Sequence, residues 1–141
     1  MKRLDHVAIC VRDLEGALRV WRDGLGLELL GIEEIPARQV RVAMLRAGDT
    51  RIELVQPTAD TSEVSRFLER RGEGLHHVAF AVEDVGAALE TATAAGAIAV
   101  PGAGQAGAGG SRVAFLNPRS VNGVLVELVE ATPPQAPSRK E

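Results

Sequence analysis

The stretch that decides the fold occurs twice, as Asp5-His6-Val7-Ala8-Ile9 and as His76-His77-Val78-Ala79-Phe80. His6 matches His77 at an offset of 71 residues (77 − 6), and the same offset places residues 41–45 on 112–116. Residues 52–55 match 126–129 at an offset of 74 (127 − 53 for the two glutamates), as expected if the second copy has three extra residues in its last turn. Such self-similarity indicates two copies of one structural unit, spanning about residues 3–57 and 75–130.

Each copy has the pattern of one strand, one helix and three further strands. Asp13 and Asp84 follow the first β-branched segment of each copy and are expected to be helix N-caps. Apolar residues then recur at the i, i+3, i+4, i+7 spacing of an amphipathic helix. They are Leu14, Ala17, Leu18 and Trp21, and Val85, Ala88, Leu89 and Ala92, with helix ends predicted at Gly24 and Gly96. Extended segments are predicted at 28–35, 40–46 and 51–56, and at 98–100, 112–116 and 124–130.

The sequence therefore predicts an α+β fold, in which two tandem β-α-β-β-β modules form a half-open, barrel-like sheet around a metal-binding cavity. Residues 1–130 of the 141 are expected to be a single domain, since one half of about 60 residues would be marginal alone. A linker helix is predicted over about 62–72, and residues 131–141 are expected to be a flexible tail. The glycine-rich stretch 102–110 is expected to be a mobile loop, because it lacks the strand-to-helix context of a phosphate-binding loop.

Charge and composition argue against several classes of function. With 16 Lys and Arg against 19 Asp and Glu, and 3% aromatic residues, the chain has neither a basic field nor a stacking platform for nucleic acid. No apolar run approaches the ~20 residues of a membrane span, and the first residues lack the apolar core of a signal peptide. We therefore expect a cytoplasmic protein with no nucleic-acid or membrane partner. The single Cys10 is expected to be a small buried hydrophobe.

The candidate site consists of four polar residues at repeated positions, His6, Glu53, His77 and Glu127. Their strand neighbours are apolar and suit the helix-covered face, so strand alternation turns the four polar side chains toward the other face, into the cavity. Any one of them could be a polar residue on an open sheet face. Two imidazoles and two carboxylates together suit a divalent transition metal, and an ionised Glu within an apolar strand is costly unless it is paired or metal-bound. We therefore predict all four as metal ligands.

Other polar residues are expected to have lesser roles. His76 should alternate to the face opposite His77 and act from the second layer of the site or from the core. Arg41 and Arg112, which also repeat, are expected to be solvated or to span the sheet. The adjacent Glu33 and Glu34 are expected to be surface charges.

On these positions the chain resembles the vicinal oxygen chelate superfamily, which includes glyoxalase I, extradiol dioxygenases, methylmalonyl-CoA epimerases and metal-free antibiotic-binding proteins. Residues 48–57, 67–80 and 113–128 look more specifically like methylmalonyl-CoA epimerases. The resemblance implies a metal-dependent epimerase of methylmalonyl-CoA or a related 2-substituted acyl-CoA. It also implies Co²⁺, Mn²⁺, Ni²⁺ or Zn²⁺ at the four ligands, a homodimer, and a loop over 117–122 at the cavity mouth.

Three positions depart from the pattern of these epimerases. Many of them have Gln in place of Glu53, a glutamate at the position of Val42, and Gly-Ala-His-Gly where this chain has residues 107–110. Because Val42 cannot transfer a proton, we predict Glu53 and Glu127 as the catalytic acid/base pair, approaching the substrate from opposite sides.

The alternatives are a lactoylglutathione lyase (glyoxalase I)-like isomerase and a non-catalytic small-molecule-binding protein. The binding protein fits less well because such proteins typically lack the complete ligand set. A two-His, one-carboxylate dioxygenase would leave one Glu unexplained.

Overall fold

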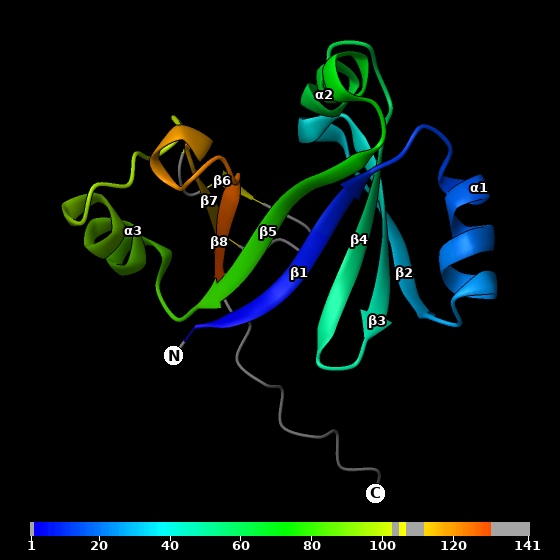
Figure 1. Ribbon diagram of the computed structural model, residues 1–141, viewed down its shortest axis with the longest axis horizontal. Helices are drawn as coiled ribbons and strands as arrows, with labels where there is room; N and C mark the ends of the chain where they lie inside the picture. The colour runs from blue at the N-terminus through cyan, green and yellow to red at the C-terminus, as the bar shows by residue number, and fades with distance from the viewer. Residues whose placement is uncertain (1, 103–104, 107–111, 131–141) are drawn as a thin grey trace, which may run out of the picture.

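A single mixed sheet of eight strands runs through both copies of the repeat (Figure 1). The computed structural model describes residues 2–102, 105–106 and 112–130. The first copy contains β1 (Arg3–Cys10), α1 (Leu14–Leu18), η1 (Arg19–Gly24), β2 (Glu28–Ile35), η2 (Pro36–Arg38), β3 (Val40–Ala47) and β4 (Thr50–Pro57). Helix α2 (Glu63–Arg71) follows, then β5 (Gly74–Val82), α3 (Val85–Ala94), β6 (Gln105–Ala106), β7 (Arg112–Leu116), η4 (Pro118–Ser120) and β8 (Val126–Glu130).

The two copies meet at the centre of the sheet, where β1 pairs with β5 in antiparallel orientation. The strand order is β2-β3-β4-β1-β5-β8-β7-β6. Within each copy the first strand pairs in parallel with the last, β1 with β4 and β5 with β8, and the remaining pairs are antiparallel. The predicted α+β fold with an open sheet is therefore confirmed, and residues of both copies lie next to each other along the β1/β5 seam.

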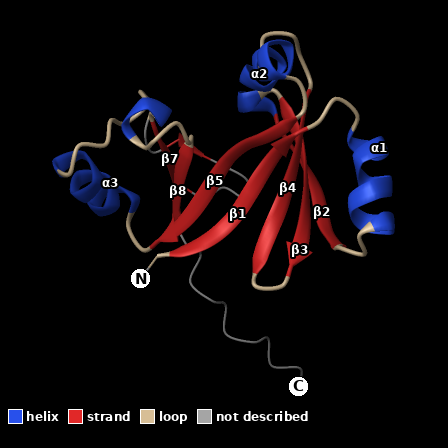
Figure 2. Ribbon diagram, in the orientation of Figure 1, coloured by secondary structure: helices blue, strands red, loops and turns tan. Residues whose placement is uncertain are grey.

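The helices leave one face of the sheet available for a site. Helices α1 and α3 lie on opposite flanks of the molecule, and α2 lies at one end (Figure 2). Leu14 and Leu18 of α1 pack against Leu54 and Leu45 of the first copy, and Val85 of α3 packs against Leu128 of the second. Val64 and Leu68 of α2 pack against Ala8 and Val55, on the face of the sheet opposite to α1. Burial of these apolar stripes fixes the helices against the sheet. Alternate side chains of β1, β4, β5 and β8 then face away from α1 and α3.

The first helix differs from its prediction. The α-helix ends at Leu18, and residues 19–24 continue as a π-helix that ends at Gly24, as predicted. Asp13 occupies the N-cap position, but its side chain accepts no capping hydrogen bond, and the Leu14 N–H instead donates to Oε1 of Gln56 at 2.7 Å. Asp84 does cap α3, accepting from the Ala87 N–H at 3.0 Å. Both aspartates thus occupy the predicted N-cap position, and of the two only Asp84 caps its helix with a side-chain hydrogen bond.

The second copy is less regular than the first. The strand predicted at 98–100 is reduced to a single bridge between Ala99 and Leu116. Helix η4 fills the longer last turn, so β8 begins at Val126 and not at 124. The linker helix is present as α2, with Ser62 as its N-cap. Most of the 102–110 stretch and all of the 131–141 tail lie outside the described residues, and the single-domain organisation of residues 1–130 stays a prediction.

No helix in the described ranges combines the length and the apolar character needed to cross a membrane.

Candidate metal centre

Two β-bulges shape the seam between the halves. In the pairing of β1 with β5, Asp5 of β1 and His76 of β5 have no partner residue on the opposite strand. At each of these two points the bulged strand has one residue more than its partner. Asp5 and His76 are equivalent in the repeat, since the offset of 71 relates them (76 − 5). The bulge is therefore a shared feature of the two copies, and it lies directly before the histidine of each.

Each bulge residue holds the histidine that follows it. Oδ2 of Asp5 lies 2.8 Å from Nδ1 of His6, and Nδ1 of His76 lies 2.8 Å from Nδ1 of His77. A partner on Nδ1 fixes the orientation of an imidazole ring and leaves Nε2 for a metal, which is the usual role of such contacts in metal sites. Both histidines are thus arranged to ligate through Nε2.

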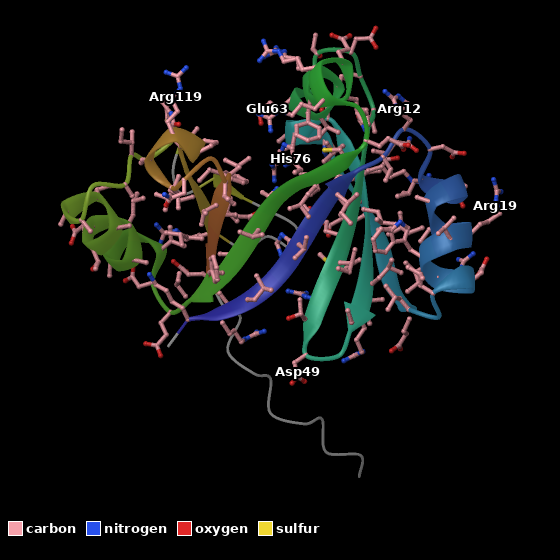
Figure 3. The ribbon with its side chains drawn as sticks, in the orientation of Figure 1. Arg12, Arg19, Asp49, Glu63, His76 and Arg119 are labelled. Carbon is pink, nitrogen blue, oxygen red and sulfur yellow. The ribbon has the colours of Figure 1, made fainter. Side chains whose placement is uncertain are left out.

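The predicted position of His76 on the opposite face is wrong, because the bulge interrupts strand alternation and brings this side chain beside His77 at the cavity. The contact fits the supporting role that was expected of it. Figure 3 labels His76 on β5, beneath the Glu63 end of α2. Asp5 was missed, although a signal existed: it precedes His6 as His76 precedes His77.

The four predicted ligands converge from β1, β4, β5 and β8. Their side chains are buried, with exposed fractions of 5% for His6, 6% for Glu53, 2% for His77 and 4% for Glu127. Nε2 of His6 lies 3.3 Å from Nε2 of His77 and 3.5 Å from Oε2 of Glu53. Oε1 of Glu127 lies 3.0 Å from Nε2 of His77 and 3.6 Å from Nε2 of His6.

This donor set fits a divalent transition metal. His6, His77 and Glu127 could hold a metal ion, since they offer ligand atoms that all lie within 4.8 Å of one another. Glu53 is outside this three-residue cluster but approaches it through His6. Two imidazole nitrogens and carboxylate oxygens, held in place by Asp5 and His76, suit a metal of intermediate softness.

Charges in the site are strongly coupled. Burial would lower the pKa of His6, but hydrogen bonds to Asp5 and Glu127 and the charge of Glu53 outweigh it and raise the pKa to about 10. Burial would raise the pKa of Glu127, but hydrogen bonds to His6 and His77 bring it down to about 2. Without a metal, the site therefore holds the imidazolium of His6 next to the carboxylate of Glu127. A metal ion that binds here displaces the proton of His6 and takes over the interaction with the carboxylate.

The bulge residues differ in charge. Burial alone would raise the pKa of Asp5, but the hydrogen bond to His6 and the charge of Arg51 outweigh burial, so the net shift of this pKa is downward. Burial and the neighbouring charges of His77 and Arg38 lower the pKa of His76 to about 4. Asp5 is therefore an anionic partner and His76 a neutral one.

A cavity of about 520 Å³ opens above the four side chains. One wall is apolar and comes from β2, β3, β4 and α2. Its members are Leu30, Ile32, Ile35, Val40, Val42, Met44, Val55 and Val64. Glu33 and Glu34 are exposed, as expected of surface charges, but Glu33 also lines this cavity. The site therefore combines a polar floor with an apolar wall, the usual composition of a small-molecule site.

Other expectations meet different outcomes. Arg41 pairs with Glu15 at 3.3 Å and Arg112 with Glu130 at 3.4 Å, both as partly exposed ion pairs, so their solvated role is confirmed. Cys10 is buried, as predicted.

None of residues 117–122 lines either cavity of the described structure, and the predicted place of this loop at the cavity mouth stays a prediction. It packs against the α3 side through Val121, and Figure 3 shows Arg119 pointing away from the sheet.

Comparison with known proteins agrees with this arrangement. Residues 5–115 match the model of the Glyoxalase/Bleomycin resistance protein/Dioxygenase superfamily. The chain is 42% identical over 129 residues to the ethylmalonyl-CoA/methylmalonyl-CoA epimerase of Cereibacter sphaeroides, covering 89% of this chain and 96% of the relative. Among solved structures, hypothetical protein BH1468 from Bacillus halodurans superposes with a TM-score of 0.92 at 36% identity, covering 96% of this chain and 97% of the other.

Streptomyces coelicolor methylmalonyl-CoA epimerase, solved as a variant with 2-nitronate-propionyl-CoA, superposes with a TM-score of 0.87 at 34% identity, covering 93% of this chain and 98% of the other. The resemblance drawn from the sequence is thus confirmed on three grounds: the family model, near-complete coverage by relatives and a shared fold. The chain belongs to the glyoxalase/bleomycin resistance protein/dioxygenase superfamily.

Proposed function

We propose that the protein is a metal-dependent epimerase of methylmalonyl-CoA or a related 2-substituted acyl-CoA. The observation that carries the proposal is the convergence of two histidines and two glutamates, one of each from each copy, on the floor of one cavity. Two kinds of carboxylate-bearing CoA thioester appear in the names of its relatives, and their similarity extends over nearly the whole chain.

His6, Glu53, His77 and Glu127 are the proposed ligands of one divalent ion, with Co²⁺, Mn²⁺, Ni²⁺ and Zn²⁺ as candidates. Such an ion, when bound, would stabilise the negative charge that develops on the substrate oxygens when the carbon between two carbonyl groups loses its proton. The protein supplies the rest: it buries the reacting carbon and aligns it with proton acceptors. The apolar wall formed by β2, β3, β4 and α2 excludes water from the 2-substituent.

Glu53 and Glu127 are the proposed acid/base pair. Epimerisation requires removal of a proton from one side of a carbon and its return on the other, which needs a proton-transfer group on each side. Glu53 on β4 and Glu127 on β8 are related by the repeat, so they flank the β1/β5 seam from its two sides. Val42, Met44 and Val55 on the cavity wall have no titratable group.

Interconversion of the two methylmalonyl-CoA epimers by metal-loaded protein tests the proposal directly. The same preparation is assayed in parallel with the hemithioacetal of methylglyoxal and glutathione. Turnover of methylmalonyl-CoA should exceed that of the hemithioacetal by a wide margin. The reverse ranking would favour the lactoylglutathione lyase alternative, and binding without turnover of either substrate would favour the non-catalytic one.

The homodimer and the cytoplasmic location belong to the same proposal. Strand β2 is an edge strand of the described sheet, and its unpaired edge supports a partner there. Light scattering of purified protein should give twice the mass of the 14.9 kDa chain. The cytoplasmic assignment rests on the composition and on the single cysteine.

A further inference from the structure

A second cavity of about 250 Å³ lies directly beside the metal centre. It is enclosed mainly by η2, the start of α2, β7 and the residues after α3. The two cavities share one wall, formed by Arg38, Val40, Val64 and His76. A ligand that extends from one cavity into the other therefore passes Arg38, the only residue of this wall with a permanent charge.

The backbone next to Arg38 is fixed by contacts of its own. Helix η2 begins at Pro36 and is closed by Gln39, whose φ of 55° is left-handed. The Gln39 carbonyl accepts a hydrogen bond from the Thr58 N–H at 2.8 Å, which ties the turn to the end of β4. These contacts offset the cost of a left-handed non-glycine residue and fix the backbone next to Arg38.

The guanidinium of Arg38 lies close to the metal centre. Its Cζ is 5.3 Å from the centroid of the Phe115 ring, and this ring in turn lies 5.4 Å from the His77 ring in an edge-on arrangement. The Phe115 ring therefore contacts both the guanidinium and a proposed metal ligand. Stacking on an aromatic face leaves the in-plane N–H donors of a guanidinium available for another group.

Arg38 differs from the other arginines of the cavity in its ion pairing. Three arginines line the main cavity, and two of them are directed to Asp5: Arg51 at 2.7 Å and Arg3 at 3.9 Å. Within the described ranges, no carboxylate lies within ion-pair distance of Arg38. A half-buried guanidinium beside a cavity favours an anionic ligand, and its planar pair of donors matches a carboxylate.

We infer that Arg38 binds the free carboxylate of the acyl group and so selects malonyl-type thioesters over simple acyl thioesters. This inference rests on the proposed function and names a specificity-determining residue for it. The position at the shared wall lets Arg38 hold the carboxylate while the rest of the thioester continues past it. His76 lines the same wall. Its Nε2 carries the hydrogen when Nδ1 accepts from His77, so it adds a second donor there.

The test compares malonyl-CoA with acetyl-CoA, which differ only in this carboxylate, by isothermal titration into metal-loaded protein. Arg38→Met keeps the length of the side chain and removes the charge, and Arg38→Lys keeps the charge but not the paired donors. Arg41→Met, which alters an arginine paired with Glu15 outside both cavities, is the matched control. Arg38→Met should weaken malonyl-CoA binding about tenfold or more and change acetyl-CoA binding less than about twofold. Arg38→Lys should fall between, and the control should change neither.

Equal weakening of both thioesters would contradict the inference, because Arg38 would then hold a group common to both, such as a phosphate of CoA. Unchanged binding of malonyl-CoA would contradict it as well. Acetyl-CoA binding also reports whether each variant is folded. If wild-type protein epimerises methylmalonyl-CoA while Arg38→Met leaves the selectivity unchanged, this inference fails alone. If the selectivity depends on Arg38 but no epimerisation occurs, the proposed function fails alone.

Discussion

Asp5 and His76 keep the same position in the two copies but differ in chemistry. Each is the extra residue of a bulge, and each contacts Nδ1 of the following histidine at 2.8 Å. Asp5 is an anion bound by Arg51, whereas His76 is neutral and packs edge-on against Phe67. The carboxylate polarises His6 more strongly than an imidazole polarises His77. We therefore expect the first half of the repeat to contribute more to metal affinity.

Replacement of Asp5 tests this expectation. Asp5→Asn removes the charge behind His6 while keeping a side-chain oxygen near Nδ1, and metal affinity should fall about 10- to 100-fold. Asp49→Asn, in the exposed β3–β4 turn, is the matched control. Competition titrations with a chromophoric chelator measure both variants. An Asp5→Asn variant with wild-type affinity would show that the ring is oriented by other contacts.

The charge state of His6 makes the metal-free protein sensitive to alkaline pH. Its pKa is raised from 6.5 to about 10, so its stabilising contribution is complete below pH 6.5 and is lost as the pH rises through 10. The pKa of Glu127 is lowered from 4.5 to about 2, so its contribution is complete above pH 4.5 and is lost as the pH falls through 2.

For metal-free protein kept in the presence of a chelator, the free energy of unfolding should therefore decrease between pH 6 and pH 9.5, by on the order of 2 kcal/mol. Thermal denaturation followed by circular dichroism measures this change. His6→Gln, which lacks the titrating group, should show a flatter dependence over the same range. A wild-type stability that is constant or rises from pH 6 to pH 9.5 would contradict the assigned charge state.

At the scale of elements, the two helix starts differ although their sequences match. Asp84 accepts a hydrogen bond from the Ala87 N–H at 3.0 Å, whereas Asp13 accepts none from its helix. Asp84→Ala should therefore lower the free energy of unfolding by about 1 kcal/mol, as loss of an N-cap does, and Asp13→Ala by much less. Chemical denaturation of both variants checks the difference. Equal losses would show that the Asp84 hydrogen bond contributes nothing specific.

The sequence predicts the elements well where hydrophobic period and repeat agree. Strand β2 has the predicted bounds, and α2 begins and ends within one residue of its prediction. The π-helix after Leu18 was not predictable, because the apolar spacing through Trp21 also fits a continuous α-helix. The prediction of a strand at 98–100 was wrong because an isolated Ala99–Leu116 bridge has the same local sequence pattern as a strand.

The site was predictable to the extent that it follows from strand alternation. All four predicted ligands are buried and lie near His6, and none of them occupies the extra position of a bulge. Asp5 and His76 do, and one extra residue in a strand reverses the expected face. Arg38 was not singled out because its position depends on a turn and on Phe115, which lies far along the chain.

The whole molecule explains why the centre needs both copies. Each copy brings one histidine and one glutamate to the seam, and the parallel pairs β1/β4 and β5/β8 place them on adjacent strands. Helices α1 and α3 cover the far side of each half, and the buried His6, Glu53, His77 and Glu127 lie along the seam. The repeat thereby places two carboxylates in related positions, which fits the proposed transfer of a proton on each side of one carbon.

Glutamine variants separate the two roles of the carboxylates. Glu53→Gln and Glu127→Gln keep an oxygen at each position but remove the basic group, so each should retain appreciable metal and lose most proton exchange. Metal analysis alongside the exchange assay distinguishes these effects. A variant that exchanges at nearly the wild-type rate would show that its carboxylate serves only as a ligand.

The most direct test of the central claim is incorporation of deuterium at C2 of methylmalonyl-CoA by wild-type protein in D₂O, with and without bound metal. We predict that metal-loaded protein exchanges this position and interconverts the epimers, and that chelation of the metal abolishes both and its return restores them. Metal-loaded protein that leaves C2 unlabelled, or metal-free protein that labels it equally fast, would contradict the account.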